Sequence, residues 1–230
     1  MTHSFDKDYW ERHWDQAQGP VAEVAEASAA HPRLGREVAG LTPGTALDAG
    51  CGTGADAVWL AGRGWQVMAA DISGHALAQA AERAAGATGA ERVTWLEADL
   101  TTWAPVDRFD LVTTSYAHPA MPQLAFYRRL SGWVVPGGTL LIVGHLHEPA
   151  AAGHEHEHGH GQHAHSPADA DQAGQQPPAE ATVTVSDITG LLDPAAWQIE
   201  SAEERTRTVT GPEGHSLPLH DAIVRATRLA

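Results

Sequence analysis

Residues 45–71 of this chain read TALDAGCGTGADAVWLAGRGWQVMAAD. An apolar strand pattern ends in glycines that alternate with other residues, and a helical pattern follows directly. Glycines let the main chain approach a ligand closely, and the start of the helix offers unpaired N–H groups. Asp71 ends the next strand pattern about 20 residues after Gly50, where a carboxylate can accept both hydroxyls of a ribose. The stretch predicts a nucleoside site, and the alternative is a tight strand-to-helix turn that binds nothing.

The alternation of apolar runs and helical patterns continues to residue 146. Strands that alternate with helices are joined by right-handed crossovers, which produce a parallel sheet with helices on both faces. The predicted strands are 45–51, 65–71, 92–100, 108–118 and 139–146, and the predicted helices are 55–64, 73–86 and 119–135.

The C-terminal part changes the topology. A short helix is predicted over 185–197, with Ser186 or Asp187 as its N-cap. Strand patterns over 197–209 and 219–230 flank a turn-rich connection, so the two strands are joined locally and one of them is antiparallel to the rest. The pattern as a whole predicts an α/β fold.

The charge balance limits the partners of this chain. It has 14 Lys and Arg against 29 Asp and Glu, a formal net charge of −15, so we expect no nucleic acid partner and no membrane partner. Cys51 is the only cysteine, which suits a reducing compartment. The first residues lack the apolar core of a signal peptide, and no apolar run reaches the length of a membrane span. We therefore expect a cytoplasmic protein.

One domain is expected over residues 1–230, with a helical N-terminal cap over 1–40. Residues 149–181 contain almost no large apolar side chain, and we interpret them as a mobile His-rich loop inserted after the fifth strand. Six histidines lie between 154 and 165 at spacings that define no fixed coordination geometry. The run is a candidate for weak divalent metal binding, and the alternative is sequence drift in a tolerant loop. No residue is assigned as a specific metal ligand.

Two ligand classes fit the glycine loop. The string Gly50-x-Gly52-x-x-Ala55 satisfies the dinucleotide fingerprint, which leaves a nicotinamide oxidoreductase as one alternative. The other ligand is S-adenosylmethionine, because the chain resembles the class I S-adenosylmethionine-dependent methyltransferases over most of its length. The resemblance implies a Rossmann-like seven-stranded, mostly parallel sheet with helices on both faces and a reversed last strand. The family motifs recur in order as DAGCGTG at 48–54, Asp71, EADL at 97–100, FDLV at 109–112 and PGG at 136–138.

The resemblance also implies which residues hold S-adenosylmethionine. Asp48 and the main chain of the glycine loop would hold the methionine moiety, and Asp71 would hold the ribose. Asp99 would bind the adenine amino group, although a helix cap is the alternative for this residue. Cys51 is interpreted as a packing residue of the loop. The full cofactor set is Asp48, Gly50, Cys51, Gly52, Gly54, Asp71, Ile72, Asp99, Leu100 and Thr114.

The resemblance is closer to one group, the tellurite-resistance and thiopurine methyltransferases. It rests on DYWERHWDQA at 8–17, DAVWLA at 56–61, GWQV at 64–67 and PGGTLLIVGH at 136–145. Members of this group methylate soft nucleophiles such as thiols and the oxyanions of selenium and tellurium. The resemblance therefore implies methyl transfer to a soft atom of a small molecule. O- or N-methylation of a small metabolite, and a catalytically silent S-adenosylmethionine- or metal-binding module, stay open.

Catalytic candidates are sought where the fourth and fifth strands end, because ligands bind at the carboxyl ends of strands in open parallel sheets. Among the polar residues there we select Tyr116, His118 and His145, and a hydrogen-bonded scaffold role is the alternative for each histidine. Trp10 and Trp14 lie four residues apart on one helical face. They are predicted to form an apolar lid over the active site, or else to anchor their helix to the core.

Overall fold

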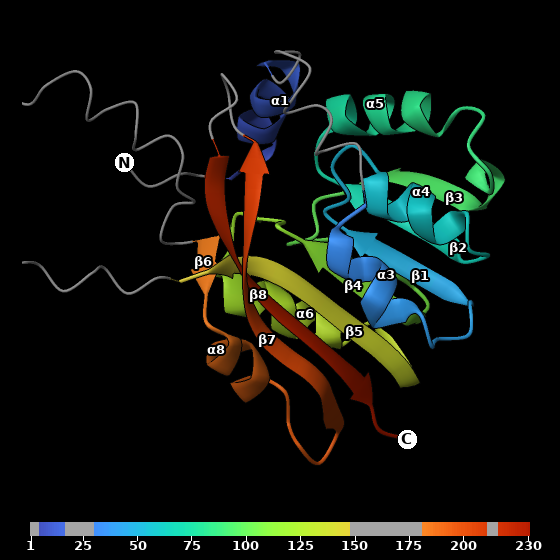
Figure 1. Ribbon diagram of the computed structural model, residues 1–230. Helices are drawn as coiled ribbons and strands as arrows, with labels where there is room; N and C mark the ends of the chain where they lie inside the picture. The colour runs from blue at the N-terminus through green and yellow to red at the C-terminus, as the bar shows by residue number, and fades with distance from the viewer. Residues whose placement is uncertain (1–4, 17–29, 148–180, 211–215) are drawn as a thin grey trace, which may run out of the picture.

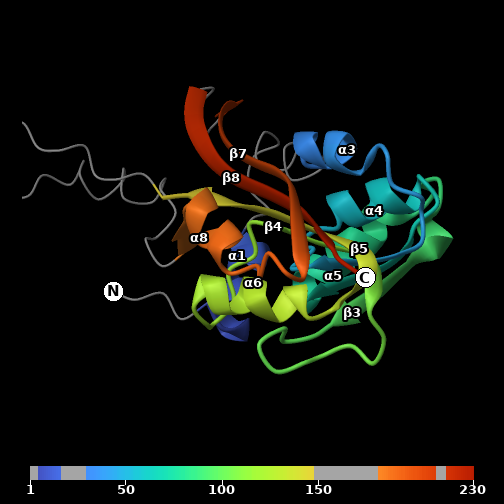
Figure 2. The same ribbon diagram turned by 90° about the horizontal axis from the view of Figure 1, so that it is seen from below.

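A mostly parallel sheet with helices on both faces forms the centre of the molecule (Figures 1 and 2). The computed structural model describes residues 5–16, 30–147, 181–210 and 216–230. The strands are β1 (Thr45–Ala49), β2 (Gln66–Asp71), β3 (Val93–Glu97), β4 (Phe109–Ser115), β5 (Val134–Leu146), β6 (Thr182–Val183), β7 (Trp197–Thr210) and β8 (Ser216–Arg228).

The strands lie in the order β3-β2-β1-β4-β5-β8-β7, and β6 pairs with β5 outside this path. Strands β1 to β5 are parallel to their neighbours in this group, whereas β8 is antiparallel to both β5 and β7. The prediction of a seven-stranded, mostly parallel sheet with a reversed last strand is therefore confirmed, and β6 is an addition. The reversal follows from the direct connection between β7 and β8, since a short hairpin joins antiparallel strands.

Helices bury the apolar side chains of the sheet on both faces. On one face α6 and α8 pack Phe126 and Ile188 against Leu47 and Ile142. On the other face α3 and α4 contribute Leu34, Val38, Ala57, Leu60 and Ala61 to a second apolar cluster. The helices are α1 (Lys7–Gln16), α3 (Pro32–Val38), α4 (Ala55–Ala61), α5 (Gly74–Ala84), α6 (Gln123–Ser131) and α8 (Val185–Gly190), with a 3₁₀ turn η1 (Ala90–Arg92).

Helix α1 and the tip of the β7–β8 pair lie beyond the ends of the parallel strands, at the same end of the sheet. Helix α1 lies beside α5, and both α1 and the tip of the β7–β8 pair lie at the end of the sheet opposite the C-terminus (Figure 1). The parallel strands end in the space between these elements, which is where a ligand site is expected.

The helix predicted over 119–135 is shorter in the structure. Gly132 ends α6, since its N–H returns to carbonyls of the last helical turn. Val134 already pairs with Phe109 in the sheet. The last residues of the predicted helix therefore belong to β5, because the sheet supplies the hydrogen bonds that a longer helix would have supplied.

The N-cap of α8 is Thr184, and not Ser186 or Asp187 as predicted. The hydroxyl of Thr184 accepts the N–H of Asp187, and the carboxylate of Asp187 accepts the N–H of Thr184. These reciprocal bonds satisfy two N–H groups that the first helical turn leaves unpaired.

The His-rich insertion predicted at 149–181 lies, except for Ala181, outside the described residues. Within the part of the chain that the structure describes, no helix combines the length and apolar character that a bilayer crossing requires. The same part holds no group of three or more His, Cys, Asp or Glu side chains placed to bind a metal ion.

The glycine loop after β1 is fixed on two sides. Gly50 and Gly52 have φ angles of +77° and +50°, which side chains disfavour. The N–H groups of Gly50 and Cys51 both donate to the carbonyl of Ala70, at 2.8 and 3.0 Å. A Cβ on Gly50 would lie 2.3 Å from the Cβ of Ala117. The main chain of this loop is therefore held against β2 and against the segment that follows β4.

Gly50→Ala is expected to lower the free energy of unfolding by roughly 1–3 kcal/mol, because the added Cβ strains the backbone and overlaps Ala117. Urea unfolding followed by circular dichroism measures the change. Gly40→Ala is the matched control, since a Cβ there meets nothing within 4 Å and its φ is not positive. Equal unfolding midpoints for the two variants would show that the loop accommodates a Cβ at Gly50 without loss of stability.

Candidate active site

A cavity of about 860 Å³ lies at the carboxyl ends of the parallel strands. Its wall is built by the glycine loop, by the ends of β2, β4 and β5, and by side chains of α1 and the β7–β8 hairpin. Most of the predicted site residues meet on this wall. They are Trp10, Trp14, Asp48, Gly50, Cys51, Gly52, Asp71, Ile72, Asp99, Leu100, Tyr116, His118 and His145.

Gly54 and Thr114, unlike the other predicted cofactor residues, are not on the wall. Thr114 is 1% exposed, and its hydroxyl donates to the carbonyl of Ala49 at 2.8 Å, so it ties β4 to β1. Gly54 precedes α4, where a Cβ would lie 2.5 Å from the ring of Trp95. Both residues act on the site through the packing around it.

Asp71 holds the glycine loop in place. Its carboxylate accepts the N–H of Gly52 at 2.8 Å and the N–H of Ser73 at 2.9 Å. Burial raises the pKa of Asp71, although these hydrogen bonds act to lower it. Because a carboxylate oxygen has more than one lone pair, Asp71 can also accept hydroxyls of a ligand in the cavity.

Asp48 carries a buried acceptor atom. The residue is 2% exposed, and no donor among the described residues reaches its Oδ2 atom. Burial, followed by the nearby carboxylates of Asp56 and Asp71, raises the pKa of Asp48 well above its usual range. A cationic ligand group would satisfy this oxygen and favour its ionised form. The wall at Asp48 therefore fits an ammonium group, such as that of a methionine moiety.

Cys51 and Asp99 line the cavity, but their surroundings limit what each side chain can do there. Burial, followed by the charges of Asp48 and Asp71, raises the pKa of the Cys51 thiol well above its usual range, so it is no nucleophile at neutral pH. The Oδ1 atom of Asp99 accepts the N–H and the hydroxyl of Thr101, at 2.8 and 2.7 Å. Asp99 thus caps the turn after β3 and also reaches the cavity.

Glu11 fastens α1 to the start of α5. Its carboxylate accepts the hydroxyl of Ser73 at 3.0 Å and the N–H groups of Gly74 and His75 at 2.9 and 3.2 Å. Burial acts to raise the pKa of Glu11, but these bonds together lower it. Because the N–H of Ser73 also donates to Asp71, Glu11 and Asp71 share one neighbour.

Trp10 and Trp14 connect α1 to two loops of the site. The indole N–H of Trp10 donates to the carbonyl of His118 at 3.1 Å. A Cβ on Gly52 would lie 3.1 Å from the ring of Trp14, whose carbonyl accepts the side-chain amide of Gln79 at 3.2 Å. Both indoles also line the cavity, so α1 is anchored at the cavity wall, and the covering role stays a prediction.

The three catalytic candidates gather at the other end of the cavity. The ring centroids of Tyr116 and His145 are 4.6 Å apart, those of His118 and His145 are 5.3 Å apart, and the indole of Trp10 stacks on His118 at 6.4 Å. Burial lowers the pKa of His118 and the pKa of His145 to about 4. Both imidazoles are therefore neutral at pH 7 and accept a proton poorly.

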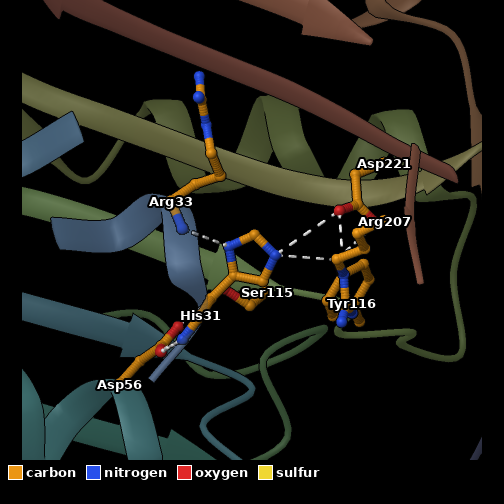
Figure 3. A network of polar contacts seen from close by, with 7 residues as sticks. All are labelled: His31, Arg33, Asp56, Ser115, Tyr116, Arg207 and Asp221. Atoms are coloured by element: carbon orange, nitrogen blue, oxygen red, sulfur yellow. Dashed lines mark hydrogen bonds and ion pairs between the residues drawn. The ribbon is translucent and has the colours of Figure 1, made fainter. Parts of the chain in front are cut away.

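A polar network that the sequence did not predict stands behind Tyr116 (Figure 3). The hydroxyl of Tyr116 donates to the Oδ1 atom of Asp221 at 2.7 Å and lies 3.1 Å from Nε2 of His31. The Nε atom of Arg207 donates to the Oδ2 atom of Asp221 at 3.2 Å. His31 and Arg207 also line the cavity, whereas Asp221 is 1% exposed behind them.

Part of this network has a signal in the sequence. Asp221 begins a buried apolar run of β8, and a carboxylate there needs a partner. Asp56 follows the glycine loop, where it accepts the N–H of His31 at 2.6 Å and the hydroxyl of Ser115 at 2.9 Å. Arg207 lies in a strand that mixes charged residues and threonines, so nothing in the pattern singles it out.

Residues 46–138 match the family model described as Methyltransferase domain. The chain is 29% identical over 135 residues to "Probable thiol methyltransferase 2" of Arabidopsis thaliana, which covers 57% of this chain and 59% of the relative. It is 30% identical over 155 residues to "Trans-aconitate 2-methyltransferase" of Streptomyces avermitilis, which covers 64% of this chain and 54% of the relative. The chain thus spans less than two thirds of the length of these relatives.

Solved structures share the fold over nearly the whole chain. One is named "Conversion of a Disulfide Bond into a Thioacetal Group during Echinomycin Biosynthesis", with a TM-score of 0.67, 23% identity, and coverage of 97% of this chain and 92% of that chain. Another is magnesium protoporphyrin IX methyltransferase from Synechocystis PCC 6803 with bound SAM, with a TM-score of 0.61, 18% identity, and coverage of 99% and 100%.

The ligand-free protein is expected to become more stable when Asp48 is replaced by Asn. The folded-state pKa of Asp48 lies above the unfolded value of about 3.9, so the stability of the wild type falls as the pH rises from about 4 toward the folded pKa. Asn cannot ionise and avoids this loss. Thermal melts between about pH 5 and about pH 8 should show the advantage of Asp48→Asn growing with pH. Parallel curves would show that Asp48 is already ionised in the free protein.

Proposed function

We propose that this chain is a class I S-adenosylmethionine-dependent methyltransferase, which its fold and the matched domain over residues 46–138 support, and that it transfers a methyl group to a soft nucleophile of a small molecule. The observation that carries the proposal is the buried, unpartnered Oδ2 atom of Asp48 beside the bare main chain of Gly50 and Gly52. This arrangement suits the ammonium group and the amino-acid tail of the donor. The relative named as a thiol methyltransferase supports the soft nucleophile.

In this proposal the glycine-loop end of the cavity holds the donor. Asp48 binds the ammonium group, and Asp71 binds the ribose hydroxyls. Asp99 and the N–H of Leu100 hold the adenine, against which Ile72 packs. When bound, S-adenosylmethionine supplies a methyl group on a positively charged sulfur, and the electrons of the broken carbon–sulfur bond return to that sulfur as the acceptor takes the methyl.

The remaining task of the protein is to align the acceptor and to exclude water. Alignment of two reactants in one site can lower a barrier by about 7–11 kcal/mol at best. Trp10 and Trp14 cover the cavity from α1, and their apolar faces keep water from the reacting atoms. Tyr116, His118 and His145 form the wall against which the acceptor is placed.

The chemistry of the acceptor end favours a nucleophile that needs no strong base. Burial raises the pKa of Tyr116, and burial lowers the pKa of His118 and His145 to about 4. A thiolate or a metalloid oxyanion needs only its own charge to attack, whereas an alcohol needs a base. The relative named for trans-aconitate supports a second candidate, O-methylation of a carboxylic acid, because a carboxylate is also ionised at neutral pH.

Wild-type protein is expected to bind S-adenosylhomocysteine in calorimetric titrations, and Asp71→Ala should weaken the binding by roughly 1–3 kcal/mol, because the ribose hydroxyls lose a buried partner. Asp107→Ala is the matched control, since this carboxylate is exposed and away from the cavity. Unchanged affinity in Asp71→Ala would remove Asp71 from the donor site.

Turnover with labelled S-adenosylmethionine separates the candidate reactions. Thiols, selenite and small carboxylic acids are offered under the same conditions, and we expect product with thiols or selenite. Product with carboxylic acids alone would favour the second candidate. Binding of S-adenosylmethionine without any product would favour a catalytically silent module.

Glu11→Gln is expected to speed the dissociation of S-adenosylhomocysteine by about tenfold, because the donors at the start of α5 lose a charged acceptor and α1 opens more readily. Stopped-flow fluorescence of the indoles on α1 measures the rate. Asp15→Asn, which changes an exposed carboxylate on the same helix, is the control. If all three proteins release the ligand at one rate, α1 is an anchor and not a lid.

A further inference from the structure

We infer that the cavity ends in an anion subsite at Arg207, which takes the acceptor in its ionised form. The inference rests on the proposed function and deepens it, since the subsite lies on the same cavity as the proposed donor site. The class of ligand is a small soft anion, which means a thiolate or an inorganic anion of sulfur, selenium or tellurium.

Charged side chains are unevenly placed on the wall. The carboxylates of Asp48 and Asp71 lie at the glycine loop and Asp99 follows β3, whereas Asp56 accepts the N–H of His31 and the hydroxyl of Ser115 beside Tyr116. Among the described residues, Arg207 alone contributes a permanent cation to the wall. The Arg207 side chain is 29% exposed, so a ligand in the cavity can reach it. The guanidinium on this wall suits an anionic acceptor, and the carboxylates at the glycine loop suit a cationic donor.

Two hydrogen bonds to other side chains fix the position of Arg207. Its Nε atom donates to the Oδ2 atom of Asp221 at 3.2 Å, and one of its terminal nitrogens donates to the hydroxyl of Tyr116 at 3.3 Å. Asp221 is buried and does not reach the wall, whereas Arg207 and Tyr116 do. The guanidinium therefore lies on the wall, with its carboxylate partner Asp221 buried and off the wall; Figure 3 shows Arg207 beside Asp221 and Tyr116.

The hydroxyl of Tyr116 also helps to hold Arg207 in position. The N–H of Arg33 donates to Nδ1 of His31 at 3.3 Å, which assigns the ring proton of His31 to Nε2. Nε2 then donates to the hydroxyl of Tyr116, and that hydroxyl donates its own proton to Asp221. Tyr116 thus orients Arg207 and has no role in removing a proton from the acceptor.

Ionisable groups surround Arg207 from several elements: Asp221 of β8, Tyr116 after β4, His145 of β5 and His31 before α3. Burial acts to raise the pKa of Asp221, but bonds from His31 and Tyr116 and the charge of Arg207 together lower it, so Asp221 stays ionised. The wall beside Arg207 therefore offers no strong base, and an acceptor that arrives as an anion needs none.

Thiocyanate is the probe for this subsite, because it is a small soft anion that needs no deprotonation. Titration into protein saturated with S-adenosylhomocysteine should give binding that Arg207→Met weakens about tenfold or more. Arg207→Lys should weaken it less, since Lys keeps the charge and loses the planar fork. Arg205→Met is the matched control on the same strand, because Arg205 pairs with Glu203 and does not reach the wall.

Binding of S-adenosylhomocysteine is measured first in every protein. If the wild type binds it but not thiocyanate, or if Arg207→Met binds thiocyanate as the wild type does, the anion subsite is overturned and the proposed function stands. If the wild type does not bind S-adenosylhomocysteine, both fall together. Should Arg207→Met not fold, as circular dichroism will show, Arg207→Gln and then Arg207→Lys replace it, and unchanged thiocyanate affinity in that variant overturns the subsite.

Asp221 is a positioning residue in this scheme. Asp221→Asn is expected to raise the KM for a thiol more than it lowers kcat and to leave the affinity for S-adenosylhomocysteine unchanged. A loss confined to kcat would overturn this role.

The pH profiles of kcat/KM are then compared for two thiols, one ionised at neutral pH and one not. The two profiles should be displaced along the pH axis by the difference between the pKa values of the two thiols. The ionisable groups of the protein contribute equally to both profiles. Identical profiles would show that the protein deprotonates its acceptor, which overturns the inference.

Discussion

The close approach between Gly50 and Ala117 is the constraint on which the site depends. It brings the loop after β1 against the segment after β4, with no room for a side chain between them. Asp48 and Gly52 lie on one side of this contact, and Tyr116 and His118 lie on the other. Because β1 and β4 are neighbours in the sheet, the proposed donor and acceptor ends of the cavity lie next to each other. Transfer between two small molecules requires such adjacency, since the reacting atoms must come within about 3–3.5 Å.

The residues of the proposed donor end meet on one wall, as the sequence predicts, because they are local. Residues 48–54 and Asp71 belong to consecutive elements, and the chain itself sets their distance. The exceptions are instructive. Gly54 and Thr114 accompany the motif, yet they pack around the site without facing the cavity, because resemblance does not separate residues that touch a ligand from residues that shape its surroundings.

The acceptor end could not be predicted in the same way because its residues are distant in the sequence. His31 precedes the first strand, whereas Arg207 and Asp221 come from the last two strands. They meet because β8 enters the sheet beside β5 and brings β7 with it, which is a property of the whole topology. Asp221 pairs with His145 across these strands, so the reversed strand sets the position of the network.

A guanidinium in a partly buried cavity is costly unless a counter-charge stabilises it, and a counter-charge beside the ligand would repel an anion. The arrangement of Asp221 resolves this conflict, because the carboxylate neutralises Arg207 from the protein side and leaves the cavity side electropositive. The buried acids at the glycine loop present the opposite case, since the raised pKa of Asp48 reflects a cost of ionisation that a cationic ligand would offset. The buried acids at the glycine loop would thus suit a cationic ligand and the guanidinium of Arg207 an anionic one, which is the combination that the proposed transfer between a sulfonium donor and an ionised acceptor requires.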